Sequence, residues 1–203
     1  MNQWLRPISG PVLALLLLLA SGGVARGQSN FSFTTGISGA YYESSALNWG
    51  TSIGTTGKFN VLPFLLLRAQ FYVDRNQFKN VVLPDFQGTQ TITYVCLGFG
   101  AEVAAGSRDF NFFGYATPHG TIRTISRITT EPDSSQKVWI LRRASMGVVF
   151  GLGFEAYVTD NIGFEMQTQY DILNFDFTDL DPIARALRAT VGVQFYLGRN
   201  FAR

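Results

Sequence analysis

Polar or small residues alternate with apolar ones in several segments, and some of these alternating residues carry charges that could form ion pairs. The pattern is clear around Arg68, in LLLRAQFYVD, and around Glu155, in GLGFEAY. Residues at i and i+2 of a strand lie on the same face, so these charges share a polar face opposite an apolar one. We predict that this face encloses a charge network made of Lys58, Arg68, Glu102, Arg123, Arg143, Glu155, Glu165, Asp171 and Arg188.

Part of this network is expected in a single layer. Arg68, Glu102, Glu155 and Glu165 each lie a few residues from a short segment rich in turn formers. A buried charge without a partner is costly, so opposite charges at one level should pair. We predict that Arg68 faces Glu102, and that Glu155 and Glu165 share a cation, with Arg68 nearest and Lys58 lower. The network is interpreted as a salt-bridged plug, and the alternative is a narrow gated conduit or a proton-linked switch.

The sequence offers few residues for catalysis. His119 is the only histidine, it shares a face with Thr121 and Arg123, and no serine lies two residues further on. Nucleophile elbows, metal-ligand clusters and phosphate loops do not occur. A single cysteine, Cys96, excludes an intrachain disulfide framework and a cysteine-based zinc cluster. We therefore predict a protein that is not an enzyme, with no catalytic residue, no cofactor and no metal.

Alternation of apolar and polar residues predicts eight strands. They are expected at 31–42, 48–59, 64–75, 90–106, 111–124, 138–159, 162–174 and 186–197. Short connections at 60–63, 107–111 and 159–161 alternate with longer ones at 43–47, 75–89, 125–137 and 175–185. Short turns on one rim and longer loops on the other are typical of an up-and-down antiparallel barrel that spans a membrane. The predicted fold class is therefore all-β, with eight strands in a transmembrane barrel.

The composition of the polar face indicates whether that face or the apolar face points into the lumen. A secreted, lipocalin-like barrel would turn its apolar face inward, whereas a membrane barrel turns it toward lipid. Several glycines lie on the polar face, where a narrow lumen has little room for side chains: Gly98, Gly100, Gly147, Gly151, Gly153 and Gly192. We predict that the polar face lines the lumen.

The first residues have the features of a secretory signal peptide. Arg6 precedes an apolar run at 12–20, and small residues follow it. This run is much shorter than the ~20 residues that a membrane-spanning helix needs. We predict a signal peptide at 1–27, cleaved after Ala25 or Gly27, and a barrel at 28–203.

The overall charge points to no charged partner. The chain has 16 basic and 14 acidic residues, a balance that argues against a nucleic-acid-binding protein. Hydrophobic residues make up 46% of the chain, and the 21 glycines and 18 phenylalanines suit strands and tight turns.

Three segments carry a resemblance to a known family. They are MGVVFGLGFEAY at 146–157, the turn at 159–161, and ATVGVQFYLG at 189–198. Together with the leader, they resemble the outer-membrane β-barrel domain family of small eight-stranded, porin-like proteins. Members typically end on a strand with a C-terminal aromatic residue. Phe195 and Tyr196 lie in such a strand, but residues 198–203 extend beyond it, and Phe201 is an alternative ending.

The resemblance implies a location and partners. It places the chain in the outer membrane of a Gram-negative cell as a monomer, with outer-membrane lipids and the barrel assembly machinery as partners. The expected function is a non-enzymatic structural or surface-interaction role in the cell envelope. One alternative is a secreted or membrane barrel that binds or transports a small hydrophobic ligand. A second is a lipid-modifying outer-membrane enzyme.

Overall fold

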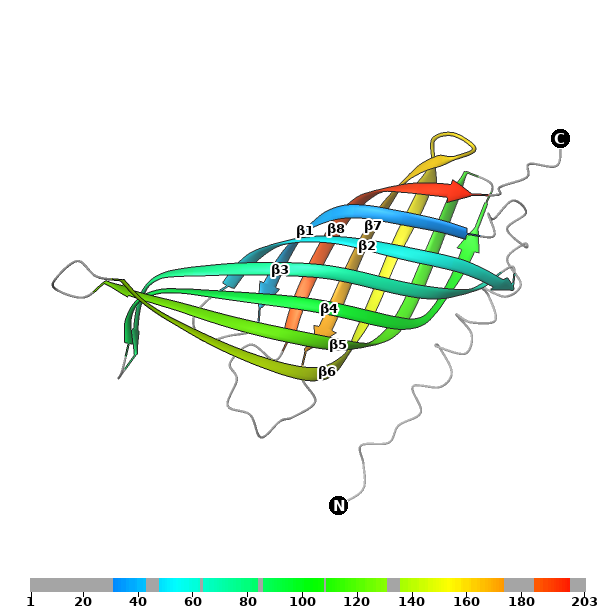
Figure 1. Cartoon of the computed structure of the whole chain (residues 1–203). Helices are drawn as coiled ribbons and strands as arrows, with labels where there is room; N and C mark the ends of the chain where they lie inside the picture. Colours follow the sequence, from blue (N-terminus) through cyan, green and yellow to red (C-terminus); the bar gives the residue numbers. More distant parts are fainter. Residues whose placement is uncertain are drawn as a thin grey trace, which may run out of the picture.

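Eight strands form a closed barrel in the computed structural model, which describes residues 31–42, 48–62, 64–83, 86–107, 109–130, 136–173 and 185–197. The strands are β1 (Phe31–Tyr42), β2 (Asn48–Leu62), β3 (Leu65–Leu83), β4 (Phe86–Gly106), β5 (Phe110–Thr130), β6 (Gln136–Tyr157), β7 (Ile162–Ile172) and β8 (Arg185–Leu197). Each strand pairs antiparallel with the next, and β8 pairs with β1 (Figure 1). The predicted up-and-down barrel is confirmed. The predicted signal peptide and the residues after Leu197 lie outside the described ranges.

The hydrogen-bond register between neighbouring strands fixes the tilt of the strands from the barrel axis. Following paired residues from Phe31 around the ring leads to Phe59, Leu67, Ala101, Ala116, Phe150, Tyr170 and Leu187, and back to β1 at Tyr41. The path returns ten residues further along β1 than it began. For eight strands this stagger corresponds to a tilt of about 40° from the barrel axis.

Two predicted loops are wrong, because most of their residues are strand. β3 continues to Leu83 and β4 begins at Phe86, while β5 continues to Thr130 and β6 begins at Gln136. These segments keep pairing as two hairpins beyond the ring. The last pairs with the rest of the barrel are Thr51 with Arg75 and Val148 with Ile172. We call residues 76–83, 86–93, 124–130 and 136–147 the wing.

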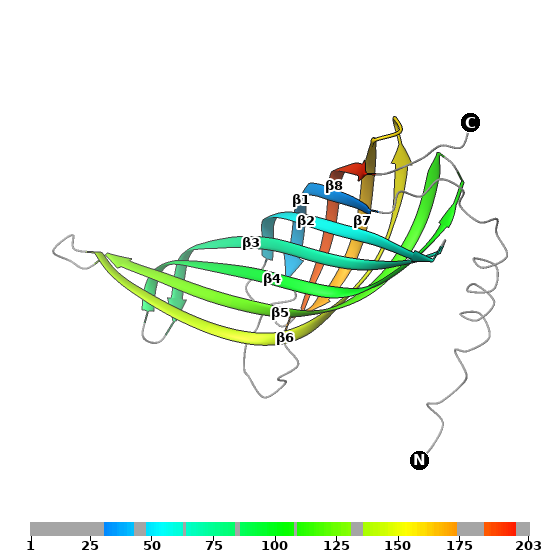
Figure 2. The same ribbon diagram turned by 45° about the vertical axis from the view of Figure 1, so that its right-hand side comes forward.

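The wing is a four-stranded sheet that projects past the ends of the other four strands. Figures 1 and 2 show β3 to β6 continuing well beyond β1, β2, β7 and β8. The rim that carries the wing is here called the long-loop rim, and the opposite rim, with the turns at 107–109 and 158–161, the short-turn rim. No described residue belongs to a helix long and apolar enough to cross a membrane.

The outer face of the ring is apolar. Ile37 and Leu152 are 72% and 73% exposed, as expected of side chains that meet lipid instead of water. Outward phenylalanines gather near the short-turn rim: Phe31, Phe33, Phe59, Phe112, Phe164 and Phe195. Tyr41, Trp49 and Tyr170 lie toward the other end of their strands. Aromatic residues at both edges of an apolar band are typical of a membrane barrel.

The lumen is so narrow that a glycine is required beside an aromatic ring. A Cβ added to Gly151 would lie 2.2 Å from Cζ of Tyr115. That ring has little freedom to move, because its hydroxyl donates to Oε1 of Gln169 at 2.7 Å. The guanidinium of Arg68 also lies 3.7 Å from the ring centroid. Gly151 therefore makes room for the tyrosine that covers Arg68.

We expect Gly151→Ala to lower the free energy of unfolding by about 1 to 3 kcal/mol, the usual cost of overpacking. The measurement is urea unfolding of the refolded barrel in detergent micelles or vesicles. Gly120→Ala is the matched control, since an added Cβ there meets nothing within 4 Å. Equal unfolding midpoints for the two variants would contradict a tightly packed lumen.

Candidate functional site

Five charged side chains form a cluster in the lumen near the short-turn rim. The lower cluster consists of Lys58, Arg68, Glu102, Glu155 and Glu165, all buried. Lys58 Nζ lies 3.0 Å from Oε1 of Glu102 and 2.8 Å from Oε2 of Glu165, and it donates a short hydrogen bond to Glu155. Arg68 Nη1 donates to Oε2 of Glu102 at 2.5 Å. Two cations and three carboxylates thus share one layer.

The strand register brings these residues together. Lys58 and Arg68 are paired across β2 and β3, and Glu155 and Glu165 are paired across β6 and β7. The ion pair between Arg68 and Glu102 lies where the sequence predicts it. The prediction that Arg68 is the cation nearest to Glu155 and Glu165 is wrong, since Lys58 contacts both glutamates, whereas Arg68 Nη2 lies 4.0 Å from Oε1 of Glu165. Counting from the turns did not show that Lys58 pairs with Arg68, because β2 and β3 shift register between Asn60 and Leu62.

Polar and aromatic side chains complete the lower cluster. Thr34 Oγ1 donates to Oε2 of Glu165 at 2.9 Å, and Gln194 Nε2 donates to Oε1 of Glu155 at 3.1 Å. Lys58 Nζ lies 4.1 Å from the ring centroid of Phe113, a cation–π contact. Buried charges are stable only when such additional partners surround the ion pair. Each charge of the cluster therefore has an oppositely charged partner, and the network closes the lumen, although Arg68 Nε and Glu165 Oε1 form no hydrogen bond within the described residues.

A second, upper cluster lies closer to the long-loop rim and consists of Asp74, Asp171 and Arg188. Arg188 Nη1 donates to Oδ2 of Asp171 at 2.5 Å, and Nη2 donates a short hydrogen bond to Asp74. Tyr42 donates to Asp74 at 2.8 Å and Tyr72 to Asp171 at 3.1 Å. Asp74 was not among the predicted network residues. The sequence could have identified it, because Asp74 lies six residues after Arg68 on the same strand and therefore on the same face.

Little space remains between the two clusters. A polar cavity of about 30 Å³ lies there, lined in part by Gln70, Gln167, Gln169 and Arg188. A volume of that size holds about one water molecule. The interpretation of the lumen as a plug fits this geometry better than a conduit for solutes.

Three further residues belong to neither cluster, although His119 lies beside the upper one. Arg123 is buried toward the long-loop rim, where it is paired with Arg143 across β5 and β6. Arg143 lies outside the lumen and is exposed, because β6 at this level extends beyond β7. His119 is buried deep in the lumen, with Nδ1 2.9 Å from Oγ1 of Thr121 and Nε2 3.8 Å from Oδ1 of Asp171.

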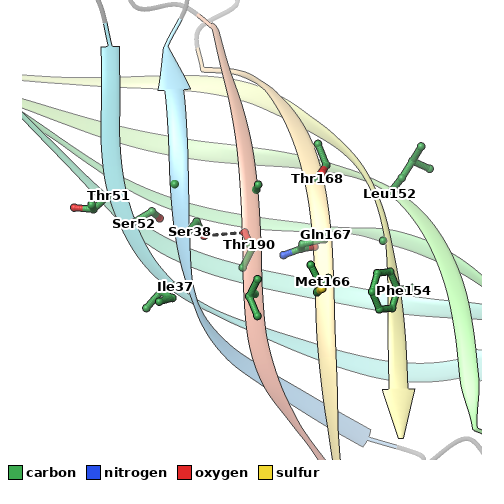
Figure 3. A pocket seen from close by; sticks show the side chains of 14 residues that line it. Ile37, Ser38, Thr51, Ser52, Leu152, Phe154, Met166, Gln167, Thr168 and Thr190 are labelled. Atoms are coloured by element: carbon green, nitrogen blue, oxygen red, sulfur yellow. Dashed lines mark hydrogen bonds between the residues drawn. The ribbon is translucent and has the colours of Figure 1, made fainter.

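An open-sided hollow of about 710 Å³ follows one row of residues across five strands. The paired residues of this row are small or flexible: Ser52, Ser38, Thr190, Gln167 and Gly153. Figure 3 shows the hydrogen bond of 2.7 Å between the Ser38 and Thr190 hydroxyls, with Ile37 and Met166 in the adjacent row. An open-sided hollow does not enclose a ligand. Within the described ranges, no group of three His, Cys, Asp or Glu residues could hold a metal ion.

Solved structures with this fold are small barrels of the bacterial outer membrane. The attachment invasion locus protein Ail of Yersinia pestis is similar with a TM-score of 0.55 at 11% identity, covering 84% of this chain and 99% of that chain. Neisserial surface protein A gives 0.53 at 16% identity, covering 83% and 98%. The outer membrane protein OprG of Pseudomonas aeruginosa gives 0.56 at 11% identity, covering 85% and 99%. Ail has also been solved in complex with the heparin analogue sucrose octasulfate.

These similarities confirm the predicted fold as that of outer-membrane barrels. No family model matches the sequence, and no curated protein matches it. The fold and the exposed apolar belt agree on the outer membrane as the location of the barrel. In such barrels short turns face the periplasm and longer loops face outward, so we expect the wing to project from the cell surface.

We expect Arg68→Leu to destabilise the barrel by about 3 to 5 kcal/mol, because the buried carboxylate of Glu102 loses one of its cationic partners. Urea unfolding in vesicles measures the change. Lys137→Leu in the exposed wing serves as the control and should change stability by no more than about 0.5 kcal/mol. An unchanged midpoint for Arg68→Leu would show that the lower cluster does not hold the barrel together.

Lys58→Met should cost at least as much, about 3 to 5 kcal/mol, because three carboxylates lose their shared cation. Adding Glu155→Gln to this variant removes one uncompensated charge, so it should restore part of the lost stability. The double-mutant cycle on the same unfolding curves gives the coupling energy. Additive losses from the two substitutions would contradict a direct interaction between Lys58 and Glu155.

Proposed function

We propose that the chain is a non-enzymatic integral outer-membrane barrel with a surface-interaction role, and that the wing carries this role. The supporting observation is the wing itself. A barrel with a purely structural role needs only to cross the membrane, yet β3 to β6 continue well past the ring. Trp139, Ile140 and Leu141 are 58%, 63% and 52% exposed there. Exposed apolar side chains that are flanked by polar ones commonly mark an interaction surface.

The charge of the wing favours an anionic partner. Its four strand segments contain five basic residues and no acidic residue, as counted from the sequence: Lys79, Arg127, Lys137, Arg142 and Arg143. On its lumen side, Arg143 is paired with Arg123. Three of these basic residues, Arg127, Lys137 and Arg143, lie on the lumen side of the wing. The complex of Ail with a heparin analogue supports a sulfated polysaccharide as the first partner to test.

The alternatives have less support. A carrier for a small hydrophobic molecule would need an apolar cavity of ~300 Å³ or more, whereas the space between the two charged clusters is small and polar. A lipid-modifying enzyme would need its histidine at the lipid surface. His119 instead lies in the lumen beside Thr121.

We expect the purified barrel in detergent micelles to bind immobilised heparin and to elute only at raised salt. The variant Arg127→Gln/Lys137→Gln/Arg143→Gln removes three charges from the lumen side of the wing and should elute at lower salt, since such binding is largely electrostatic. A heat-modifiable shift on gels verifies that each variant is folded. Elution of the wild type in the unbound fraction would argue against an anionic partner.

The location is tested separately by labelling intact cells with a membrane-impermeant maleimide. In a Cys96→Ser background, Lys137→Cys should react and Asp160→Cys, on the short-turn rim, should not. Labelling of Asp160→Cys alone would reverse the orientation of the barrel and place the wing in the periplasm.

A further inference from the structure

One row of residues crosses the lipid side of the four wing strands and carries two arginines. Arg75 is paired with Thr93, Thr93 with Thr124, and Thr124 with Arg142. Paired residues in an antiparallel sheet lie on the same face. The row therefore reads Arg, Thr, Thr, Arg across β3, β4, β5 and β6, on the face that continues the lipid-facing belt.

The row marks the upper edge of that belt. The outward row directly below it is apolar in all four strands: Val73, Val95, Ile122 and Ala144. The outward row directly above it is mostly polar: Gln77, Thr91, Ser126 and Ile140. The change from hydrocarbon to headgroups normally coincides with such a change in side chains. Arg75, Thr93, Thr124 and Arg142 are thus the first polar groups above the hydrocarbon on this wall.

Both arginines are available for an external partner. Arg75 and Arg142 are exposed, and neither forms a hydrogen bond or an ion pair with another residue within the described part of the chain. The row has no acidic residue. A guanidinium at the edge of the hydrocarbon layer is favourable when it meets an anionic headgroup there.

The spacing suits one headgroup lying between the two arginines. Strands are spaced by about 4.8 Å, so Arg75 and Arg142, three strands apart, are separated by about 14 Å. Long side chains reach over the neighbouring strand of a sheet, so both guanidinium groups can lean toward the centre of the row, where Thr93 and Thr124 offer hydroxyl donors. Because the strands tilt, Arg142 lies about 9 Å further from the hydrocarbon than Arg75. The row therefore climbs through the headgroup layer.

We propose that Arg75, Thr93, Thr124 and Arg142 form a binding site for a phosphate-bearing lipid of the outer leaflet. Arginine binds phosphate through paired, charge-assisted hydrogen bonds, and the apolar rows below accept the acyl chains. This site lies on the lipid side of the wing, so it is separate from the lumen-side surface proposed for a partner outside the cell.

Native mass spectrometry of the full barrel, released from micelles containing added lipid A, tests the site. Wild-type protein should retain lipid A that carries its phosphates and lose lipid A from which they have been removed. Arg75→Gln/Arg142→Gln should weaken retention at least about tenfold, the loss expected when charge-assisted hydrogen bonds are removed. Inorganic phosphate, added in excess, should not displace the lipid, because it lacks the acyl chains.

Arg127→Gln/Lys137→Gln is the matched control, since it removes the same amount of charge from the lumen side of β5 and β6 and should retain lipid A as the wild type does. Equal weakening by both variants would overturn the proposal and leave only general attraction to a basic wing. If the wild type retains phosphorylated and dephosphorylated lipid A equally, that result alone overturns the proposed phosphate site. Heparin binding separates this result from the surface-interaction role, because Arg75→Gln/Arg142→Gln should lower the eluting salt concentration less than Arg127→Gln/Lys137→Gln does.

Discussion

The ammonium of Lys58 contacts three carboxylates from three strands, and the rest of the lumen is arranged around that contact. Glu102, Glu155 and Glu165 come from β4, β6 and β7, so one cation on β2 links nearly the whole ring. Water cannot solvate these charges in a lumen of this width, and each must find its partner among the others. The glycine that admits the Tyr115 ring, and the ring that covers Arg68, are consequences of the same requirement.

A lumen closed in this way leaves the outer surfaces as the places where the protein can act. Two charged clusters and a cavity the size of a water molecule fill the interior. The tilted strands continue past this plug on one side only, and they expose a lumen-side face and a lipid-side face beyond the ring. The fold of small outer-membrane barrels is shared by proteins with different roles, so the features specific to this chain carry the functional argument.

Period-two alternation was enough to predict the fold and the side of the wall on which most charges lie. Strand parity alone placed Arg68 and Glu102 in the lumen, because lipid excludes charge from the other face. It could not show that Lys58 is the cation nearest to Glu155 and Glu165, since the pairing of Lys58 with Arg68 depends on a register shift at 60–62 that no local pattern encodes. It also assigned 76–83, 86–89 and 125–130 of the wing to loops, although it placed 90–93 and 138–147 in strands. Both faces of β6 are exposed at 137–144, so the contrast between apolar and polar positions is lost in that part of the strand.

That loss of contrast is itself informative about the wing. Inside the membrane, each residue of β6 faces either lipid or the plugged lumen, and the sequence obeys both constraints. Above Ala144 neither constraint applies, yet the chain does not become a loop of turn residues. It keeps β-branched and aromatic residues that favour a sheet, together with arginines on both faces. A sheet extended this far holds its side chains at fixed spacings, which a flexible loop cannot do. Fixed spacing is of use when the partner has a regular arrangement of charges, such as a polysaccharide on one face and a layer of lipid headgroups on the other.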